Sequence, residues 1–525
     1  MKGTDYIRTR ETEYPDYTAE IDALDKLKDT PEYEENLPKI LKRIIDKHEP
    51  NRKRTKALYD RYKANDEAVP IFSRKPRFGN SIKPINHKIN NDFFSEIVDF
   101  FTGYFGTITY SYSQTEESEE ETAKKKGVLS KFFKKLVSGE DAVERAAKKL
   151  SDFVTRNSMA DKDNEVKKIA SICGYVGRLL YHDKEGEERV SIVMPFECVA
   201  LGEDLVEPKY AVRLYKIKDI EDKTVAKAEF YDGDFCYYFE GGSWSALKLV
   251  NKKETLFGGL CPLQIIPKNL ELLGDAEKVL ASIDAYDRTV SDASNEMENF
   301  ASAILAFKNI KLDKNDMNRL KAEGSIQFNS LGGSDSDLFF VTKDINDTFI
   351  EHHLDRLKND IYRFSKTPNL SDGTFGNESG EARKFRITGI EARCNVFQGK
   401  LTSAGVYMFK LLANAWNAQN IPIDPLQCYM EFKRNFPLDI QTEANAIASL
   451  IGCGYPKKAA FALASFVDDV DYIMQLIEEE EEQGIASLTK TLPTDYDDLT
   501  GSNDTDQDEL VSSKQGGISS KKIEE

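Results

Sequence analysis

The sequence predicts an α+β protein in which helices flank a central β-rich module. Short β candidates with turn signals fill residues 178–267, while helical periodicity prevails before residue 172 and after residue 275. The chain has 525 residues, more than one hydrophobic core normally supports, which suggests roughly three structural units. Hydrophobic residues make up 40% of the chain, enough to build real cores.

The N-terminal region, residues 1–111, is predicted to be helical with one short strand. Residues 18–66 and 85–105 both repeat apolar side chains three and four positions apart, as helices do. Pro38 falls where we expect the first turn of a helix, which tolerates proline. Alternation over residues 107–112 predicts a strand. The apolar stripe of the first helix comprises Leu37, Ile40, Leu41, Ile44 and Ile45.

A charged linker and the β-rich module follow. Residues 112–142 hold an acidic run, a basic run and a short basic amphipathic piece, which favours a solvated insertion over a membrane or nucleic-acid contact. The next region, 143–270, opens with one predicted helix over 143–172. Asp232-Gly233 and Gly241-Gly242 are hairpin signals. The β candidates are residues 190–194, 210–215, 228–231, 236–239 and 246–250.

Three long helical patterns dominate the C-terminal half. The first covers 275–307, and at 1.5 Å per residue it predicts a helix about 45–50 Å long. The second covers 345–364. The third covers 381–417, with a narrow apolar seam of coiled-coil type and three internal glycines that favour a kink. The structural regions that contain these helices are 271–307, 344–366 and 381–440. The last region also contains a predicted strand over 428–432.

Shorter segments separate and follow these helices. Residues 308–343 hold a predicted short helix and two predicted strands, 325–329 and 338–341. Residues 367–380 form a loop rich in glycine and asparagine with a single aromatic side chain, Phe375. A small helical unit is predicted over 441–483. The final segment, 484–525, is rich in Ser, Asp and Thr, a composition typical of disorder.

The sequence contains no motif of a catalytic or phosphate-binding site. There is no GxxxxGK[ST] loop, no GxGxxG after a strand, no GxSxG and no HExxH. His352 and His353 are adjacent on a predicted helix and point about 100° apart, which disfavours a shared metal ion. The acidic stretch 495–501 lacks the ligand order of a calcium loop. We therefore expect no catalytic residue, no metal and no cofactor, and a structural or binding role.

Charge and cysteine content restrict the class further. The net charge of −18 disfavours tight nucleic-acid binding by phosphate neutralisation, although such a protein can still guide DNA without gripping it. The charged N-terminus does not resemble a signal peptide, and no run of about 20 apolar residues predicts a membrane span. The seven scattered cysteines, none in a CxxC pair, indicate a reduced intracellular protein with buried thiols.

Several short motifs occur in a specific order and spacing. They are NHKINN at 86–91 before IVDFFTGYFG at 97–106, ASICGYVGR at 170–178 before MPFE at 194–197, PKNL at 267–270 before GDAE at 274–277, IDAYDRTVSDASNEME at 283–298, and SGEA at 379–382. In this order, over roughly residues 35–480, the chain resembles the portal proteins of long-tailed phages of Gram-positive bacteria. The charged insertion and the long tail depart from that pattern.

The resemblance implies a phage portal fold with a β-containing wing, a long-helix stem, a small αβ clip and a helical crown. It implies a ring of twelve subunits at one capsid vertex, through which double-stranded DNA is packaged and ejected. The implied partners are the terminase large subunit, head–tail connector proteins, and the major capsid and scaffolding proteins, without a membrane. The implied location is the virion, and the host cytoplasm during assembly.

The resemblance also implies positions for three sets of site residues. Acids of the first stem helix are channel-lining candidates, because like charges disfavour sticking to phosphate; the alternative left open is that they pair with neighbouring subunits or face water. These acids are Asp284, Asp287, Glu296 and Glu298. The DNA-channel tunnel loop comprises Asn369, Leu370, Asp372, Gly373, Phe375, Gly376 and Asn377. The clip candidates for partner binding are Lys311, Asp316, Lys321 and Phe328.

Two other classes of protein compete with a portal. One is a non-enzymatic cytoplasmic helical scaffold that binds other proteins and has no DNA channel. The other is a nucleic-acid enzyme with unrecognised motifs. Two long helices joined by a small αβ unit cannot bury both of their faces alone, and copies arranged in a ring would supply the missing cover.

Overall fold

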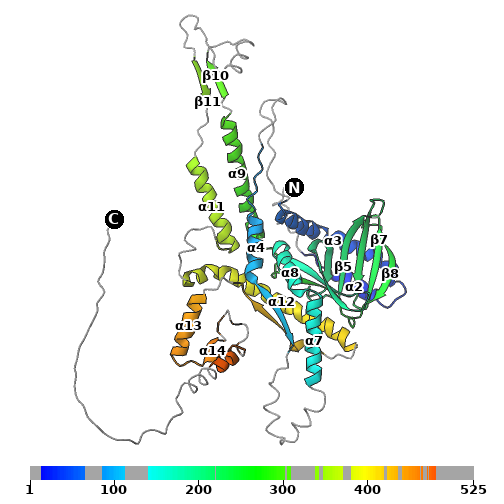
Figure 1. Ribbon diagram of the computed structural model, residues 1–525. Helices are drawn as coiled ribbons and strands as arrows, with labels where there is room; N and C mark the ends of the chain where they lie inside the picture. Colours follow the sequence, from blue (N-terminus) through cyan, green and yellow to red (C-terminus); the bar gives the residue numbers. More distant parts are fainter. Residues whose placement is uncertain are drawn as a thin grey trace, which may run out of the picture. The chain divides into compact units, whose positions relative to one another are not determined.

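The protein is described by a computed structural model that covers residues 14–64, 86–112, 140–218, 220–301, 304–308, 337–341, 347–369, 380–418, 423–435, 440–461, 463–464, 467, 470 and 472–480 (Figure 1). These residues fall into two units, Met1–Phe436 and Pro437–Glu525. Both helices and sheets are present, so the predicted α+β class is confirmed.

A five-stranded antiparallel sheet carries two helices on one face. Along the chain, α2 (Thr18–Leu27) and α3 (Tyr33–Tyr62) precede the sheet and pack their apolar side chains against its inner face. Both predicted hairpin signals are confirmed, since they lie at the turns after β6 and β7. The strands, in spatial order, are β4 (Cys198–Leu201), β5 (Tyr210–Lys218), β6 (Thr224–Tyr231), β7 (Phe235–Gly241) and β8 (Lys248–Glu254).

A tyrosine side chain makes hydrogen bonds with the backbone of the edge strand β4. The hydroxyl of Tyr14 donates a hydrogen bond to the carbonyl oxygen of Ala200 (3.0 Å) and accepts one from its amide (2.8 Å). A single tyrosine therefore satisfies both backbone groups that the free edge of β4 exposes at this position.

A second sheet is buried on both faces. It has the order β3-β2-β9, with β2 at Tyr175–His182, β3 at Glu188–Val193 and β9 at Leu263–Pro267. The sequence prediction missed β2, β4 and β9. Every residue of β4 and β9, and most of β2, is buried, so these strands lack the alternation by which a half-exposed strand is recognised.

The predicted helix over 143–172 is wrong as one element, because two helices occupy it. α7 (Glu140–Arg156) and α8 (Met159–Cys173) are separated by Ser158, whose φ of 48° is left-handed. α8 ends at Gly174, also left-handed, where a Cβ atom would lie 2.0 Å from the carbonyl oxygen of Leu272. Only glycine fits this close backbone approach.

Two details near the N-terminus also differ from the prediction. Pro38 and Pro50 both lie inside α3, so Pro38 does not occupy the first turn. The apolar contacts of this long helix with the sheet outweigh the missing amide donors. The next helix, α4 (Phe93–Phe105), starts later than expected, because residues 86–92 form neither helix nor strand and Asp92 adopts a left-handed φ of 55°.

The first long helix is shorter than predicted. α9 spans Leu280–Ala301, about 33 Å at 1.5 Å per residue, and the short helix η5 (Glu277–Val279) precedes it. The apolar run Ile304–Lys308 is instead strand β10, which pairs with β11 (Asp337–Val341). α11 (Asp347–Ser365) confirms the second prediction and lies beside α9 in Figure 1.

The third long helix is confirmed as α12 (Gly380–Ala418), and its later part is the core of the larger unit. It packs against α4 and against a ribbon of β1 (Thr107–Tyr112) and β12 (Cys428–Lys433), both predicted as strands. Gly405 permits the close contact with this ribbon, because a Cβ atom there would lie 2.1 Å from Met430 Sδ.

The smaller unit contains α13 (Ile440–Gly452) and α14 (Lys457–Phe461), joined by an apolar cluster of Ile447, Ala460 and Ala464. Helix was predicted here. Six cysteines are buried as expected, but Cys453 is exposed. Among the residues that the structure describes, no helix is long and apolar enough to cross a bilayer.

Candidate functional site

One face of α9 carries a stripe of polar side chains, and the N-terminal part of the chain covers it. Asp284, Asp287, Ser291 and Asn295 recur three and four positions apart, and all are at most 2% exposed. Glu277, seven residues before Asp284, continues the same stripe and is also buried. A stripe with helical period is expected to meet a single partner surface.

Two arginines of α3 neutralise the first part of this stripe. Arg54 binds Glu277 with two hydrogen bonds, Nε to Oε1 at 2.9 Å and Nη2 to Oε2 at 2.7 Å. Arg61 forms an ion pair with Asp284. Because seven residues are about two helical turns, Arg54 and Arg61 lie on the same face of α3 and meet acids that are also seven apart.

A segment without regular secondary structure, residues 86–92, covers the rest of the stripe; we call it the strap. The amides of His87, Ile89 and Asn91 donate to Asn295 Oδ1 (2.6 Å), Ser291 Oγ (2.9 Å) and Asp287 Oδ1 (3.0 Å). Alternate amides of the strap thus bond to side chains four residues apart on α9, a match that an extended chain allows, because two extended residues advance about 6.6 Å and four helical residues about 6 Å. The side chains of α9 thus replace a neighbouring β-strand as partner of the strap.

These contacts correct part of the predicted channel lining. Asp284 and Asp287 are enclosed by Arg61 and by Asn91, so the expectation that they face a channel is wrong for both. Burial raises the pKa of Asp287, while the two hydrogen bonds from Asn91 oppose that shift. Glu298 is exposed and pairs with His87, and Glu296 is half-buried. A channel position for these last two remains a prediction.

Removing the polar stripe should release the strap. With Asp287, Ser291 and Asn295 all changed to alanine, we expect the amide protons of His87, Ile89 and Asn91 to exchange roughly five- to tenfold faster, since each lost bond contributes about 1 kcal/mol. Amide hydrogen exchange measures this directly. The matched control is T289A, on another face of α9. Unchanged exchange in the triple variant would show that the strap is held by other contacts.

A second charged junction joins the start of α9 to α12. Asp275 lies between two cations: Lys268 Nζ is 3.0 Å from Oδ2, and Arg393 Nη2 is 2.9 Å from Oδ1. Ser171 of α8 also donates to this carboxylate. Burial alone would raise the pKa of Asp275, but Lys268 and Arg393 outweigh it and lower the pKa. Lys268 also lies over the ring of Phe101.

Arg393 extends this junction to the end of α11. Its Nη1 donates to the carbonyl oxygen of Ser365, one of the last carbonyls of that helix. The amide of Thr367 bonds to the carbonyl oxygen of Tyr362 (3.1 Å), and Lys366 adopts a left-handed φ of 57°, as in a Schellman cap. Both helices of the pair are therefore fixed to α12 at the same place.

Lys268 gives this junction a pH dependence. Burial lowers the pKa of Lys268 to about 7, while the Asp275 carboxylate acts in the opposite direction. The pKa in the unfolded chain is about 10.4, so the folded protein gains stability as pH rises from about 7 to about 10 and loses it on the way down. In K268M we expect a flatter stability curve over this range, measured by denaturant titration. A variant as pH-dependent as the parent would contradict the assignment.

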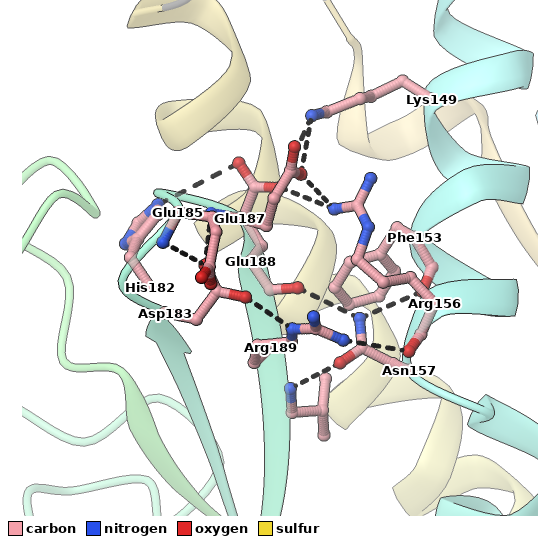
Figure 2. Close-up of polar contacts among 11 residues, drawn as sticks. Lys149, Phe153, Arg156, Asn157, His182, Asp183, Glu185, Glu187, Glu188 and Arg189 are labelled. Atoms are coloured by element: carbon pink, nitrogen blue, oxygen red, sulfur yellow. Dashed lines mark hydrogen bonds and ion pairs between the residues drawn. The ribbon is translucent and has the colours of Figure 1, made fainter.

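A third polar cluster holds α7 against the hairpin of β2 and β3 (Figure 2). Glu188 is fully buried, with Lys149 Nζ 3.6 Å and Arg156 Nη1 3.8 Å from its Oε2. Asn157 donates to the carbonyl oxygen of Glu188 (3.1 Å) and accepts from the amide of Val190 (2.8 Å). The cluster fixes the point at which the chain re-enters the core after the charged insertion.

The charged clusters described above join helices and strands of the larger unit. No group of three or more His, Cys, Asp or Glu side chains among them is placed to bind a metal ion. Of the predicted tunnel loop, Asn369 is half-buried just after α11. The other six, Leu370, Asp372, Gly373, Phe375, Gly376 and Asn377, lie outside the described residues. So do the clip candidates Lys311, Asp316, Lys321 and Phe328.

Sequence reasoning missed the partners of the α9 stripe. The available signals were the seven-residue spacing of Arg54 and Arg61, and the polar repeat Asp287–Ser291–Asn295 inside an amphipathic helix. Lys268 and Arg393 gave no such signal, because Lys268 is an isolated cation after an apolar strand and Arg393 is one of several cations in α12.

Comparison with known proteins supplies the family. No curated protein matches the chain. A family model described as phage portal protein, SPP1 Gp6-like, matches residues 41–486. The matched residues include the α9 stripe, the Asp275 junction and the Glu188 cluster, together with helices α9, α11 and α12. The match confirms the resemblance inferred from motif order. The chain therefore belongs to the SPP1 Gp6-like family of phage portal proteins.

Proposed function

We propose that this portal protein closes into a ring of twelve subunits, with α9 and α11 as its stem and the β10–β11 ribbon at the base of its clip. Membership of the family means that the chain serves as a DNA portal at a capsid vertex. The subunit number, the assignment of parts and the individual partners are our proposal.

Exposed apolar side chains on the stem are the observation that supports this proposal most. Met297 of α9 and Phe349 of α11 are each 69% exposed, and Phe364 is 58% exposed. A helix pair normally buries such residues, at a gain of about 1.5–3 kcal/mol for each full burial. Neighbouring copies in a closed ring provide a cover that the single chain lacks.

The partners follow from this arrangement. The clip meets the terminase large subunit during packaging and head–tail connector proteins afterwards, and the wing contacts the major capsid and scaffolding proteins. The protein itself catalyses nothing and takes no cofactor, so purified protein should show neither ATPase nor nuclease turnover. The ring assembles in the host cytoplasm before it becomes part of the virion.

Ring formation is tested by light scattering and negative-stain microscopy of the purified chain. The expected result is a single species of about twelve copies with a central hole. A monomer or dimer at every concentration would instead favour the competing class, a helical scaffold without a channel.

The tunnel-loop assignment has a separate test. Deleting residues 373–377 should leave rings intact, because both flanking helices are fixed by the Asp275–Arg393 junction, and should block DNA packaging. Rings are counted by microscopy and packaged heads by their protected DNA. Deleting a matched five residues from the tail, 505–509, serves as control. Normal phage yield from the loop deletion would remove this assignment.

A further inference from the structure

A small cavity lies where the turn between α2 and α3 meets the five-stranded sheet. Its volume is about 210 Å³. One water molecule takes up roughly 30 Å³, and a site for a drug-sized molecule measures about 300–1,000 Å³. The cavity therefore has room for a single side chain of several atoms. Its walls come from residues 28–34, from residues 232–237 around the β6–β7 turn, and from Lys252 of β8.

The buried lining of this cavity is largely aromatic, and its exposed lining is largely acidic. The rings of Tyr33 and Tyr237 are buried and meet edge to face, with their centroids 5.8 Å apart. Phe235 lies beside Tyr237 and is half-buried. Aromatic faces and carboxylates both attract cations. The exposed acids of the lining are Asp29, Glu34 and Asp234.

Asp232 adds a buried carboxylate to the lining and forms no ion pair within the part of the chain that the structure describes. Its Oδ1 accepts hydrogen bonds from the amides of Asp234 (3.1 Å) and Phe235 (2.7 Å), and its Oδ2 accepts one from the hydroxyl of Tyr33 (3.4 Å). These donors are all neutral. The nearby ammonium of Lys28 pairs with Asp234 instead. Buried charges are normally paired with an opposite charge, which a cation in the cavity supplies.

Lys252 shows how this lining holds a cation. Its Nζ lies 4.0 Å from the centre of the Phe235 ring and 5.0 Å from that of Tyr237, both within the cation–π range of about 6 Å. The same ammonium pairs with Glu34 (2.9 Å), and the side chain is about a third exposed. A lysine has a flexible stem and can swing out into water. Lys252 is therefore an internal competitor for any cation that enters from outside.

We infer that this cavity binds an arginine side chain of a basic partner protein, with the guanidinium group between the Asp232 carboxylate and the rings of Phe235 and Tyr237. A guanidinium group stacks on aromatic rings and offers two parallel N–H groups to a carboxylate, which an ammonium group does not. The net charge of −18 favours a basic partner. All lining residues belong to one chain, so the inference does not depend on the proposed ring.

Saturation-transfer NMR tests this inference on the purified full-length chain. The probe is N-acetyl-arginine methylamide, and the matched control probe is its citrulline analogue, which has nearly the same shape and no charge. We expect saturation transfer to the arginine side chain and binding about tenfold weaker for citrulline, because a charged hydrogen-bond partner is lost. Equal binding of the two probes, or no binding of the arginine probe, would overturn the inference.

Two substitutions should change the affinity for the arginine probe in opposite directions. D232N keeps the oxygen that accepts from the two backbone amides but removes the charge, and it should weaken binding about tenfold. K252A removes the competing ammonium and frees Glu34, and it should strengthen binding about threefold. D222N changes an exposed acid in the β5–β6 turn and should bind like the parent.

Circular dichroism shows whether each variant is folded. If D232N does not fold, K252A decides alone, because its exposed side chain is not part of the core. Stronger binding in K252A supports the competition that the cavity implies. Unchanged or weaker binding in K252A would mean that the probe binds elsewhere, and the assignment of the cavity would then be wrong.

Discussion

D275N is expected to lower the free energy of unfolding by about 3–5 kcal/mol, the cost of removing one partner from a buried ion cluster. Among the described residues, Asp275 is the only carboxylate that forms ion pairs with both Lys268 and Arg393. Without it, Lys268 can lose its proton, but the guanidinium of Arg393 stays charged. A largely buried charge then remains without a counter-ion at the point where α9, α11 and α12 meet.

Denaturant titration of the ring at one fixed protein concentration measures this effect, because assembly adds to the apparent stability. D152N is the matched control, since Asp152 lies exposed on α7 and its loss should cost at most about 0.5 kcal/mol. Equal stability of D275N and the control would mean that the cluster contributes little to folding.

R54M should lower the free energy of unfolding by a similar amount, about 3–5 kcal/mol. Arg54 and Glu277 are both almost fully buried and share two hydrogen bonds, and Arg54 also donates to the carbonyl oxygen of Leu272 (2.7 Å). In R54M, Glu277 retains the amide of Gly274 as donor (3.0 Å), which cannot neutralise its charge.

Two further variants show whether charge causes that loss. R52M removes a half-buried pair two residues away on the same helix, Arg52 with Glu49, and should cost less than about 1 kcal/mol. R54M/E277L removes both buried charges and should recover most of the stability, because apolar replacement of a whole buried pair is often neutral. A double variant as unstable as R54M would show that packing, and not the unpaired carboxylate, explains the effect.

These two variants affect the same part of the molecule. Glu277 and Asp275 both lie just before α9, and one is held by α3 while the other is held by α12. The start of α9 is therefore anchored from two sides. We expect either variant to reduce ring yield even where the chain still folds.

Local sequence patterns were sufficient to predict many helices and strands of this protein and its family. Helical periodicity identified α11 and α12 to within a few residues, the Asp-Gly and Gly-Gly turns located both hairpins, and β1 and β12 were also predicted as strands. The order of short motifs along the chain was enough to indicate the portal family. These features depend on neighbours within about four residues or on order along the chain, so a single sequence contains them.

Other features required the tertiary structure. The acids of α9 have the same spacing whether they face water, a channel or another helix. Their surroundings are decided by contacts with residues far away in the sequence. Arg61, which pairs with Asp284, is 223 positions from it, and Asn91, which binds Asp287, is 196 positions from it. Strand β10 likewise continues the apolar pattern of α9, and only its pairing with β11 makes it a strand. Local residue patterns thus specified most of the helical segments and the family that they form. Folding brought distant charged residues together in the interior, and this alone decided that the polar face of α9 is covered.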